Sequence, residues 1–231
     1  MEILAIIPAR GGSKGIPGKN YKSLIGKPLI EYTINTAKNS NLSELIVSTD
    51  DEHILNISRK LDVKTPFIRP DNLSSDKAKS IDVAVHALLS MERINNIEYE
   101  DIMLLQPTTP FRRVEDINNA IGLLINNNDS DSVISVVNVE GNHPARMKYI
   151  KDGVLIDPDF CEEYENQNRQ ELNQMYIRNG AIYLTKREVL LSNSFKGNKC
   201  LALKMPRVNS INIDSALDFT FAEYLINKKI V

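Results

Sequence analysis

The stretch ILAIIPARGGSKGIPGKN spans residues 3–20 and joins an apolar run to a loop rich in glycine and basic residues. The run at 3–7 is wholly apolar, which is typical of a strand covered on both faces. In the loop, Gly11 and Gly12 follow that strand closely, and glycine lets backbone N–H groups turn toward an anion. The stretch therefore predicts a buried first strand whose carboxyl end leads into an anion site.

Similar apolar runs follow at 45–48, 102–105 and 133–137, separated by helical patterns at 28–40, 50–61, 80–91 and 114–126. Strands that alternate with helices imply right-handed crossovers between parallel strands. The order predicts an α/β fold with a Rossmann-like, doubly wound, mostly parallel sheet. In such sheets, ligands bind at the carboxyl ends of the strands.

The alternation stops near residue 140. Residues 140–178 are polar and turn-rich, a strand is expected at 179–185, and an amphipathic helix is expected at 216–227. The sequence has no internal repeat. We expect one domain over 1–231, with 140–178 as an excursion that forms a lid or a dimerisation arm.

Composition limits the class of protein. The chain has 231 residues, 42% hydrophobic and 25% charged, and 28 basic against 30 acidic residues give a net charge of −2. This balance argues against bulk binding to nucleic acid or to an anionic membrane. The two cysteines, Cys161 and Cys200, have no metal-type spacing, and the apolar start is too short for a signal core or a spanning helix. We expect a cytoplasmic protein.

The glycine-rich loop fits neither common phosphate motif. A Walker loop requires glycine where Ser13 stands and a hydroxyl where Asn20 stands, and the glycine spacing does not give G-x-G-x-x-G. Its three cations, Arg10, Lys14 and Lys19, are nevertheless suited to neutralising a triphosphate. The alternative is a solvated turn with ordinary surface lysines.

Further blocks follow the loop in order along nearly the whole chain. They read IVSTDDEHI (46–54), FIRPDNLSSD (67–76), LLQPTTPFR (104–112), NHPARMK (142–148), NGAIYL (179–184) and SINIDSALDF (210–219). Together with ARGGSKGIPGKN, the set resembles the acylneuraminate cytidylyltransferase family, which comprises CMP-sialic acid synthetases and their legionaminate and pseudaminate relatives.

The resemblance implies an activity. CTP and a nonulosonic acid of sialic or legionaminic type give the CMP-sugar and pyrophosphate, with magnesium (Mg2+) as cofactor and a homodimer as the assembly. It also implies a setting in bacterial surface glycan synthesis. Two alternatives remain at this stage. One is a nucleotidylyltransferase for another nucleotide, another sugar acid or a sugar 1-phosphate, and the other is a nucleotide-binding relative without catalysis.

The resemblance also implies site residues. Catalytic roles are expected for Arg10, Lys19 and Asp214. The expected nucleotide contacts are Arg10, Gly11, Gly12, Lys19, Asn20, Arg69 and Ser80. The expected sugar contacts are Gln106, Arg146, Arg169 and Arg178. An arginine suits the acceptors at O2 and N3 of cytosine, and a basic residue suits the carboxylate of the sugar.

Several of these positions have structural alternatives. Ser80 begins a helical pattern and is a candidate N-cap, and Asn20 is a candidate turn cap. Thr108 and Thr109 either line the site or stabilise a turn. Arg112 faces either phosphate or solvent. Arg169 and Arg178 lie near the sugar, across a dimer interface, or in solvent.

His143 precedes a proline, so a structural role in a turn is expected rather than a role as general base.

The metal block departs from the family pattern. The family carries two aspartates one residue apart, and here Asn212 stands at the first position and Asp214 at the second. An amide oxygen ligates Mg2+ but brings no charge, so we expect metal binding to depend mainly on Asp214 and on the triphosphate. The alternative is that Asp214 caps the last helix beside Ser215 and Asp218.

Overall fold

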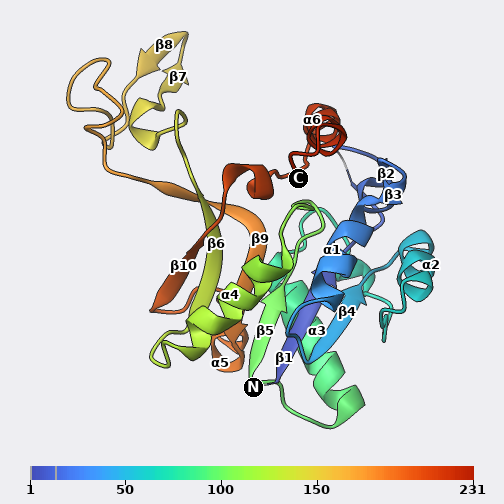
Figure 1. The fold of residues 1–231 in the computed structure, drawn as a ribbon. Helices are drawn as coiled ribbons and strands as arrows, with labels where there is room; N and C mark the ends of the chain where they lie inside the picture. The colour runs from blue at the N-terminus through green and yellow to red at the C-terminus, as the bar shows by residue number, and fades with distance from the viewer. Residues whose placement is uncertain (1, 14) are drawn as a thin grey trace.

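The computed structural model describes residues 2–13 and 15–231, so the predicted loop cation Lys14 lies outside the described residues. Within that part of the chain, a six-stranded sheet has the strand order β10-β6-β9-β5-β1-β4 (Figure 1). Its strands are β1 (Ile3–Pro8), β4 (Glu44–Ser48), β5 (Asp101–Leu104), β6 (Ser132–Asn138), β9 (Tyr176–Lys186) and β10 (Cys200–Lys204).

The sheet is mostly parallel, which confirms the predicted fold class. β1 pairs in parallel with β4 and β5, and β10 pairs in parallel with β6. β9 is antiparallel to both of its neighbours, β5 and β6. The reason is the path of the chain, which leaves the carboxyl end of β6, runs through the excursion and re-enters the sheet at that same end. β10 and the direction of β9 were not predicted.

Helices cover the sheet close to the predicted positions. They are α1 (Leu29–Lys38), α2 (Glu52–Lys60), α3 (Ser80–Asn95), α4 (Val114–Ile125), α5 (Arg187–Leu191) and α6 (Ala216–Asn227). The pattern at 50–61 shortens to α2 because Asp51 is its N-cap, and its carboxylate accepts from the backbone N–H groups of His53 and Ile54. α5 was not predicted.

The first strand is buried on both faces, as its composition requires. Ile3, Ala5 and Ile7 belong to one core cluster, together with apolar residues of α1 and α4. Leu4 and Ile6 belong to a second cluster, together with residues of α3 and α5. Because successive side chains of a strand point to opposite faces, a run without polar residues suits a strand between two layers of helices.

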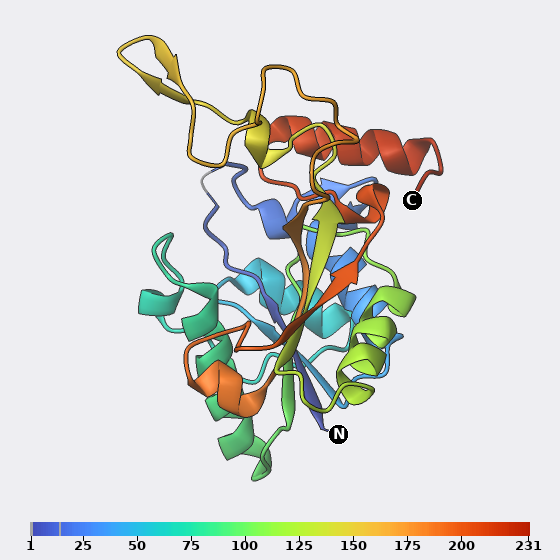
Figure 2. The ribbon, with the colours of Figure 1, turned by 90° about the vertical axis from the view of Figure 1, so that its left-hand side faces the viewer.

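The chain between β6 and β9 projects away from the sheet (Figures 1 and 2). It carries the 3₁₀ turn η3 (Pro144–Arg146) and a hairpin of β7 (Tyr149–Lys151) and β8 (Val154–Ile156). We call residues 139–175 the arm. The hairpin side chains are exposed, with Ile150 at 76% and Leu155 at 69%.

The remaining short elements are β2 (Ser23–Leu24), β3 (Lys27–Pro28), η1 (Lys19–Tyr21), η2 (Asp71–Leu73) and η4 (Arg207–Ser210). None of the helices formed by the described residues is long and apolar enough to cross a membrane.

Candidate active site

A cavity of about 360 Å³ opens at the carboxyl ends of β1 and β5, the sheet edge at which ligands are expected. We call it the central cavity. Nine of the predicted site residues line it: Arg10, Gly12, Lys19, Asn20, Arg69, Ser80, Gln106, Asn212 and Asp214. They come from segments far apart in the sequence, so the fold assembles a single site from separate motifs.

The glycine-rich loop is tied to itself and to the end of β4. Asn20 is buried, and its Nδ2 donates to the backbone oxygen of Arg10 at 3.0 Å. The Gly11 N–H donates to Asp50 Oδ1 at 3.1 Å. Asn20 therefore holds the two ends of the loop together while also lining the cavity. Gly11 is not among the described residues that line the cavity, because its N–H turns toward Asp50.

Arg10 faces the cavity from this loop. Its guanidinium pairs with the carboxylate of Asp76 at 2.6 Å, and both side chains are about one-third exposed, at 32% and 35%. Asp76 belongs to the chain segment before α3, which also lines the cavity. A cation from the loop and a carboxylate from that segment therefore meet in the lining of the cavity.

Lys19 begins η1 and points toward the segment that contains Asp214. Its Nζ donates to the backbone oxygen of Ile213 at 2.8 Å and to Asp214 Oδ1 at 3.0 Å. The Lys19 side chain is only 11% exposed, whereas that of Asp214 is 67% exposed. The carbonyl contact fixes the position of the ammonium group, and Asp214 remains open to the cavity.

Arg69 is a rigid part of the wall. It is 3% exposed, and its Nε donates to Ser48 Oγ at 3.1 Å, while Nη2 donates to the backbone oxygen of Ser48. Burial lowers the pKa of the guanidinium to about 10, and the nearby Asp50 carboxylate opposes that shift. Arg69 therefore stays charged at neutral pH.

Neither helix-cap alternative is correct. Lys79 occupies the N-cap position of α3, and Ser80 is the first helical residue, exposed at the cavity. Ser215 is the N-cap of α6, and its side chain forms a capping box with Asp218. That hydroxyl contact holds the pKa of the Asp218 carboxyl below its usual range. Asp214 precedes the cap and is left to the cavity.

The turn after β5 presents Gln106 and Thr108 to the cavity. The backbone oxygen of Thr108 accepts from Ile213 N–H at 2.8 Å, which joins this turn to the segment of Asp214. Thr109 is buried, and its Oγ1 donates to the backbone oxygen of Asn179 at 3.0 Å. Thr108 therefore lines the site, and Thr109 stabilises the turn.

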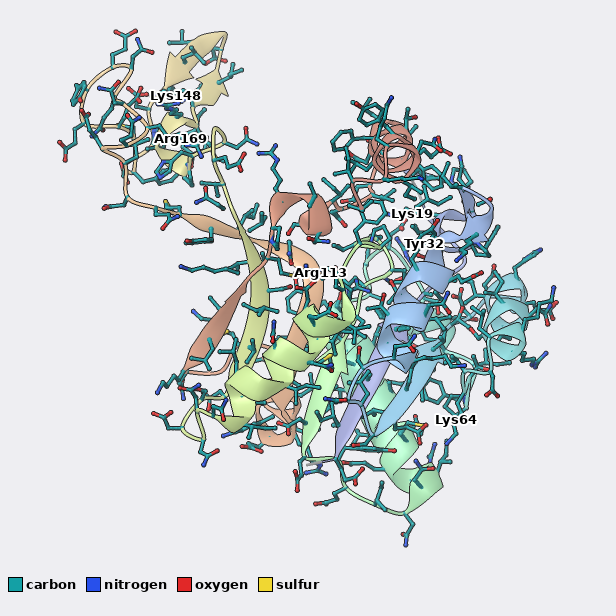
Figure 3. The ribbon with its side chains drawn as sticks, viewed as in Figure 1. Lys19, Tyr32, Lys64, Arg113, Lys148 and Arg169 are labelled. Atoms are coloured by element: carbon teal, nitrogen blue, oxygen red, sulfur yellow. The ribbon has the colours of Figure 1, made fainter. Side chains whose placement is uncertain are left out.

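Arg112 is buried and is not among the described residues that line the central cavity, so it faces neither a phosphate site there nor solvent, and both predicted alternatives are wrong. It is 2% exposed, its Nη1 donates to Thr33 Oγ1 at 2.7 Å, and its Nη2 donates to the backbone oxygen of Gln106. Burial lowers its pKa to about 9, and Asp116 counters part of that shift. Arg112 therefore stabilises the turn that carries Gln106 from inside the core. The exposed arginine is its neighbour Arg113, labelled in Figure 3.

The predicted sugar arginines are not brought together within one chain. Arg146 lines a second cavity of about 900 Å³, which shares Asn212 with the central cavity, and its Nη2 donates to the Gln167 oxygen at 2.8 Å. Arg178 lines a third cavity. Arg169 is exposed on the arm, on the opposite side of the molecule from Lys19 in Figure 3.

His143 is a structural residue of the arm. It is the N-cap of η3, where Nδ1 accepts from Ala145 N–H at 3.2 Å. With Nδ1 as an acceptor, Nε2 carries the proton and donates to the backbone oxygen of Asn173 at 2.9 Å. Both ring nitrogens are therefore used by the fold.

Asn212 and Asp214 offer oxygen ligands at the cavity. Asn212 Nδ2 contacts Asp214 Oδ2, so a half-turn of the amide would present its oxygen beside the carboxylate. No group of three or more His, Cys, Asp or Glu side chains suited to a metal ion occurs among residues 2–13 and 15–231. One carboxylate and one amide oxygen suit Mg2+, which keeps several waters and takes further ligands from substrate phosphates.

The sequence profile described as cytidylyltransferase matches residues 4–196. The chain belongs to the cytidylyltransferase family. This cytidylyltransferase is 32% identical over 229 residues to the CMP-N,N'-diacetyllegionaminic acid synthase of Legionella pneumophila, with 98% of this chain and 97% of that protein covered. It is 34% identical to the pseudaminic acid cytidylyltransferase of Campylobacter jejuni, with 97% and 96% covered.

An N-acylneuraminate cytidylyltransferase of Escherichia coli is 36% identical to this cytidylyltransferase, with 99% of the chain but only 53% of the longer relative covered. Among solved structures, a CMP:2-keto-3-deoxy-manno-octonic acid synthetase complexed with CTP superposes with a TM-score of 0.71 at 17% identity, with 99% and 100% covered. That likeness supports the fold. The names of the three sequence relatives refer to three different acids, whereas their identities to this chain are similar. Sequence identity alone therefore does not indicate which acid this chain uses.

Proposed function

We propose that the chain transfers CMP from CTP to the anomeric hydroxyl of a nonulosonic acid of sialic or legionaminic type and releases pyrophosphate. The hydroxyl oxygen forms a bond to the α-phosphorus and its proton passes to solvent. The bond from the α-phosphorus to the bridging oxygen breaks, and that electron pair leaves with pyrophosphate. The relatives named above support the reaction class.

The observation that carries the proposal is the composition of the central cavity. Arg10 and Lys19 enter it from one loop, Arg69 from its contacts with Ser48 at the end of β4, and Gln106 from the turn after β5. Cations positioned around a triphosphate neutralise the charge that develops on the leaving group. A polar amide beside them is suited to orienting a sugar hydroxyl.

Two of these cations, Arg10 and Lys19, are paired with carboxylates in the structure. Arg10 contacts Asp76, and Lys19 contacts Asp214. A triphosphate would replace the Asp76 contact at Arg10, since the phosphate oxygens carry more charge than one carboxylate. Lys19 would keep the Ile213 carbonyl as one partner and turn a remaining N–H toward phosphate.

Asp214 and the turned amide of Asn212 are the residues that would hold Mg2+. When bound, the ion would share the negative charge of the triphosphate. Because Asn212 brings no charge, we expect an Asp214→Asn variant to require several times more Mg2+ for half-maximal rate. An unchanged magnesium titration would remove Asp214 from the metal site.

The test is pyrophosphate release with CTP and Mg2+ across sialic, legionaminic, pseudaminic and 3-deoxy-octulosonic acids, with sugar 1-phosphates as a further arm. We expect a clear responder among the sialic and legionaminic acids. Turnover with a sugar 1-phosphate alone would refute the acid substrate. Thermal protection by CTP without any turnover would indicate a nucleotide-binding relative.

We also infer that the arm packs on a second copy of the chain. Tyr149, Ile150, Val154 and Leu155 are exposed on a two-stranded hairpin, which cannot bury its own apolar side chains. Docking of the arm would bring Arg146 and Arg169 toward the other copy. Within one chain, the predicted sugar-binding arginines lie at separate places, and such a dimer would explain how they reach one site. Residues 1–231 would form one domain in each copy.

Light scattering at assay concentration tests the assembly. Wild type should run as a dimer, and Leu155→Asp should shift it to monomer. Ile94→Asp, a matched change at a 51% exposed isoleucine of α3, should leave the dimer intact. A monomeric wild type would refute the assembly.

A cytoplasmic setting rests on the free thiols of Cys161 and Cys200 and on the nucleotide substrate.

A further inference from the structure

The pairing of β6 with β9 is interrupted beside the central cavity. Ile134 pairs with Tyr183 and Val136 with Arg178, so two steps along β6 correspond to five along β9. The extra residues of β9 include Asn179 and Gly180, and Gly180 has a φ of +76°. An irregularity of this kind redirects side chains locally. Here it turns the Asn179 amide into the interior, where the residue is 6% exposed.

Each polar atom of that amide has a partner. Oδ1 accepts from Ser135 Oγ at 2.6 Å and from the Ala181 N–H at 3.1 Å. Nδ2 donates to Ser210 Oγ at 2.8 Å and to Met205 Sδ at 3.3 Å. Because the Ala181 N–H can only donate, its contact determines which amide atom is the oxygen.

One branch of this network leads to the proposed metal ligands. Ser210 ends η4 and lies shortly before Asn212 and Asp214 in the chain. Its single hydroxyl proton is committed to the Pro206 oxygen at 2.8 Å, so the hydroxyl must accept from Asn179 Nδ2. An acceptor at position 179 would leave this contact unmade.

The other branch leads to Gln106. The backbone oxygen of Asn179 accepts from Thr109 Oγ1 at 3.0 Å, and Thr109 belongs to the turn that carries Gln106. Gly180 lies directly against the Gln106 side chain, since a Cβ at Gly180 would lie 2.7 Å from Gln106 Oε1. The same short stretch of β9 therefore contacts both walls of the site.

We infer that Asn179 is a positioning residue, which sets the register between the turn bearing Gln106 and the segment bearing Asn212 and Asp214. It is not among the described residues that line the central cavity, so it acts through its neighbours. The inference rests on the proposed function. A transfer between two bound substrates is sensitive to misplacement of either one by about 1 Å, which gives such a residue a kinetic effect without substrate contact.

Two conservative variants separate the branches. Ser210→Ala removes the acceptor of the Asn179 Nδ2 hydrogen bond on the branch that leads to Asp214. It should raise the Mg2+ requirement and the KM for CTP about fivefold to tenfold, the effect of one partly buried hydrogen bond. Its KM for the acid should stay within about twofold. Thr109→Val keeps the shape but removes the contact toward Gln106, so it should raise the KM for the acid and spare both other constants.

Thr220→Ala is the matched control, because the Thr220 hydroxyl donates to Ala216 O within its own helix and the residue is exposed on α6. Asn179→Asp should disturb the Ser210 branch, since a carboxylate oxygen replaces the Nδ2 donor opposite Ser210 Oγ, whereas the backbone oxygen that accepts from Thr109 is retained. Thermal unfolding of every variant identifies loss of folding. Ser210→Ala and Thr109→Val are the decisive pair if Asn179→Asp does not fold.

Two results would overturn the inference. One is unchanged kinetic constants in both folded variants, and the other is a parallel change of all constants that follows the loss of stability. If wild type turns over no acid, the proposed function fails. The inference is then tested by calorimetry of CTP with Mg2+, which Ser210→Ala should weaken and Thr109→Val should not.

Discussion

Replacing Lys19 with methionine separates its catalytic contribution from its structural one. The side chain is 11% exposed and has two partners, the Ile213 carbonyl and the Asp214 carboxylate. Methionine fills a similar volume without charge. If Lys19 stabilises the triphosphate in the transition state, the free energy lost from transition-state stabilisation should exceed the free energy lost from folding.

The contacts give the two magnitudes. The ion pair has a partner that is 67% exposed, so it contributes at most about 1 kcal/mol. The bond from the ammonium group to the carbonyl adds about 1.5 kcal/mol. Unfolding free energy should therefore fall by about 2 kcal/mol. Removing one preorganised donor from a developing anion costs about 3–4 kcal/mol, which lowers kcat/KM by about 10²- to 10³-fold.

The assay is pyrophosphate release at saturating acid and varied CTP, with thermal unfolding measured on the same samples. Lys64→Met is the control, because Lys64 also pairs with a carboxylate, Glu44 at 3.0 Å, but lies far from Lys19 in Figure 3. It should keep wild-type kinetics. A folded Lys19→Met variant with kcat/KM within about threefold of wild type would refute the phosphate role, because the loss of one preorganised donor should lower kcat/KM by about 10²-fold or more.

Three further perturbations follow from the contacts. Gly180→Ala should raise the KM for the acid about tenfold without changing the KM for CTP. The reason is that the new Cβ would meet Gln106 Oε1 and that the backbone has a φ of +76°, which favours glycine. Equal changes in both KM values would contradict this expectation. Asp76→Asn should remove the ion pair with Arg10 and tighten CTP binding about twofold to fivefold, the range for a partly exposed ion pair. Calorimetry measures this affinity, and weaker CTP binding by the variant would contradict the expectation. Burial raises the pKa of Asp101 to about 6, so its folded state prefers the proton. That stability is complete below about pH 4 and is lost as the pH rises through 6. At pH 8, the free energy of unfolding of Asp101→Asn should exceed that of wild type by about 2–3 kcal/mol, and at pH 4.5 the difference should shrink to about 1 kcal/mol. A difference that stays constant with pH would exclude the titration.

The predictions that succeeded depend on local chemistry. The apolar runs at 3–7 and 102–105 are strands because a segment without polar side chains must be covered on both faces. The helix predicted at 216–227 is α6, at those bounds, because Ser215 and Asp218 form a capping box. These signals lie within a few residues of the element they define.

The features that were mispredicted or not predicted depend mostly on distant neighbours. Arg112 is charged, and its local sequence resembles a surface turn, yet Thr33 and the Gln106 carbonyl bind it inside the core. β9 runs antiparallel because the arm returns the chain to the same end of the sheet. Ser80 lies one residue inside α3 instead of at its cap. For Arg112 and β9 the deciding partner is remote in sequence, whereas for Ser80 the helix simply begins one residue earlier.

By itself, the sequence determined the strand–helix alternation, the glycine-rich loop at a strand end and the kinds of side chain suited to a nucleotide and an acidic sugar. Periodicity and residue chemistry are local properties that one chain displays directly. Only the tertiary structure decided that Lys19 meets Asp214, that Asp76 pairs with Arg10, and that Asn179 joins two walls of the cavity. Contacts of this kind depend on how the sheet brings distant segments to one edge, because their geometry arises from packing and is carried by no single motif.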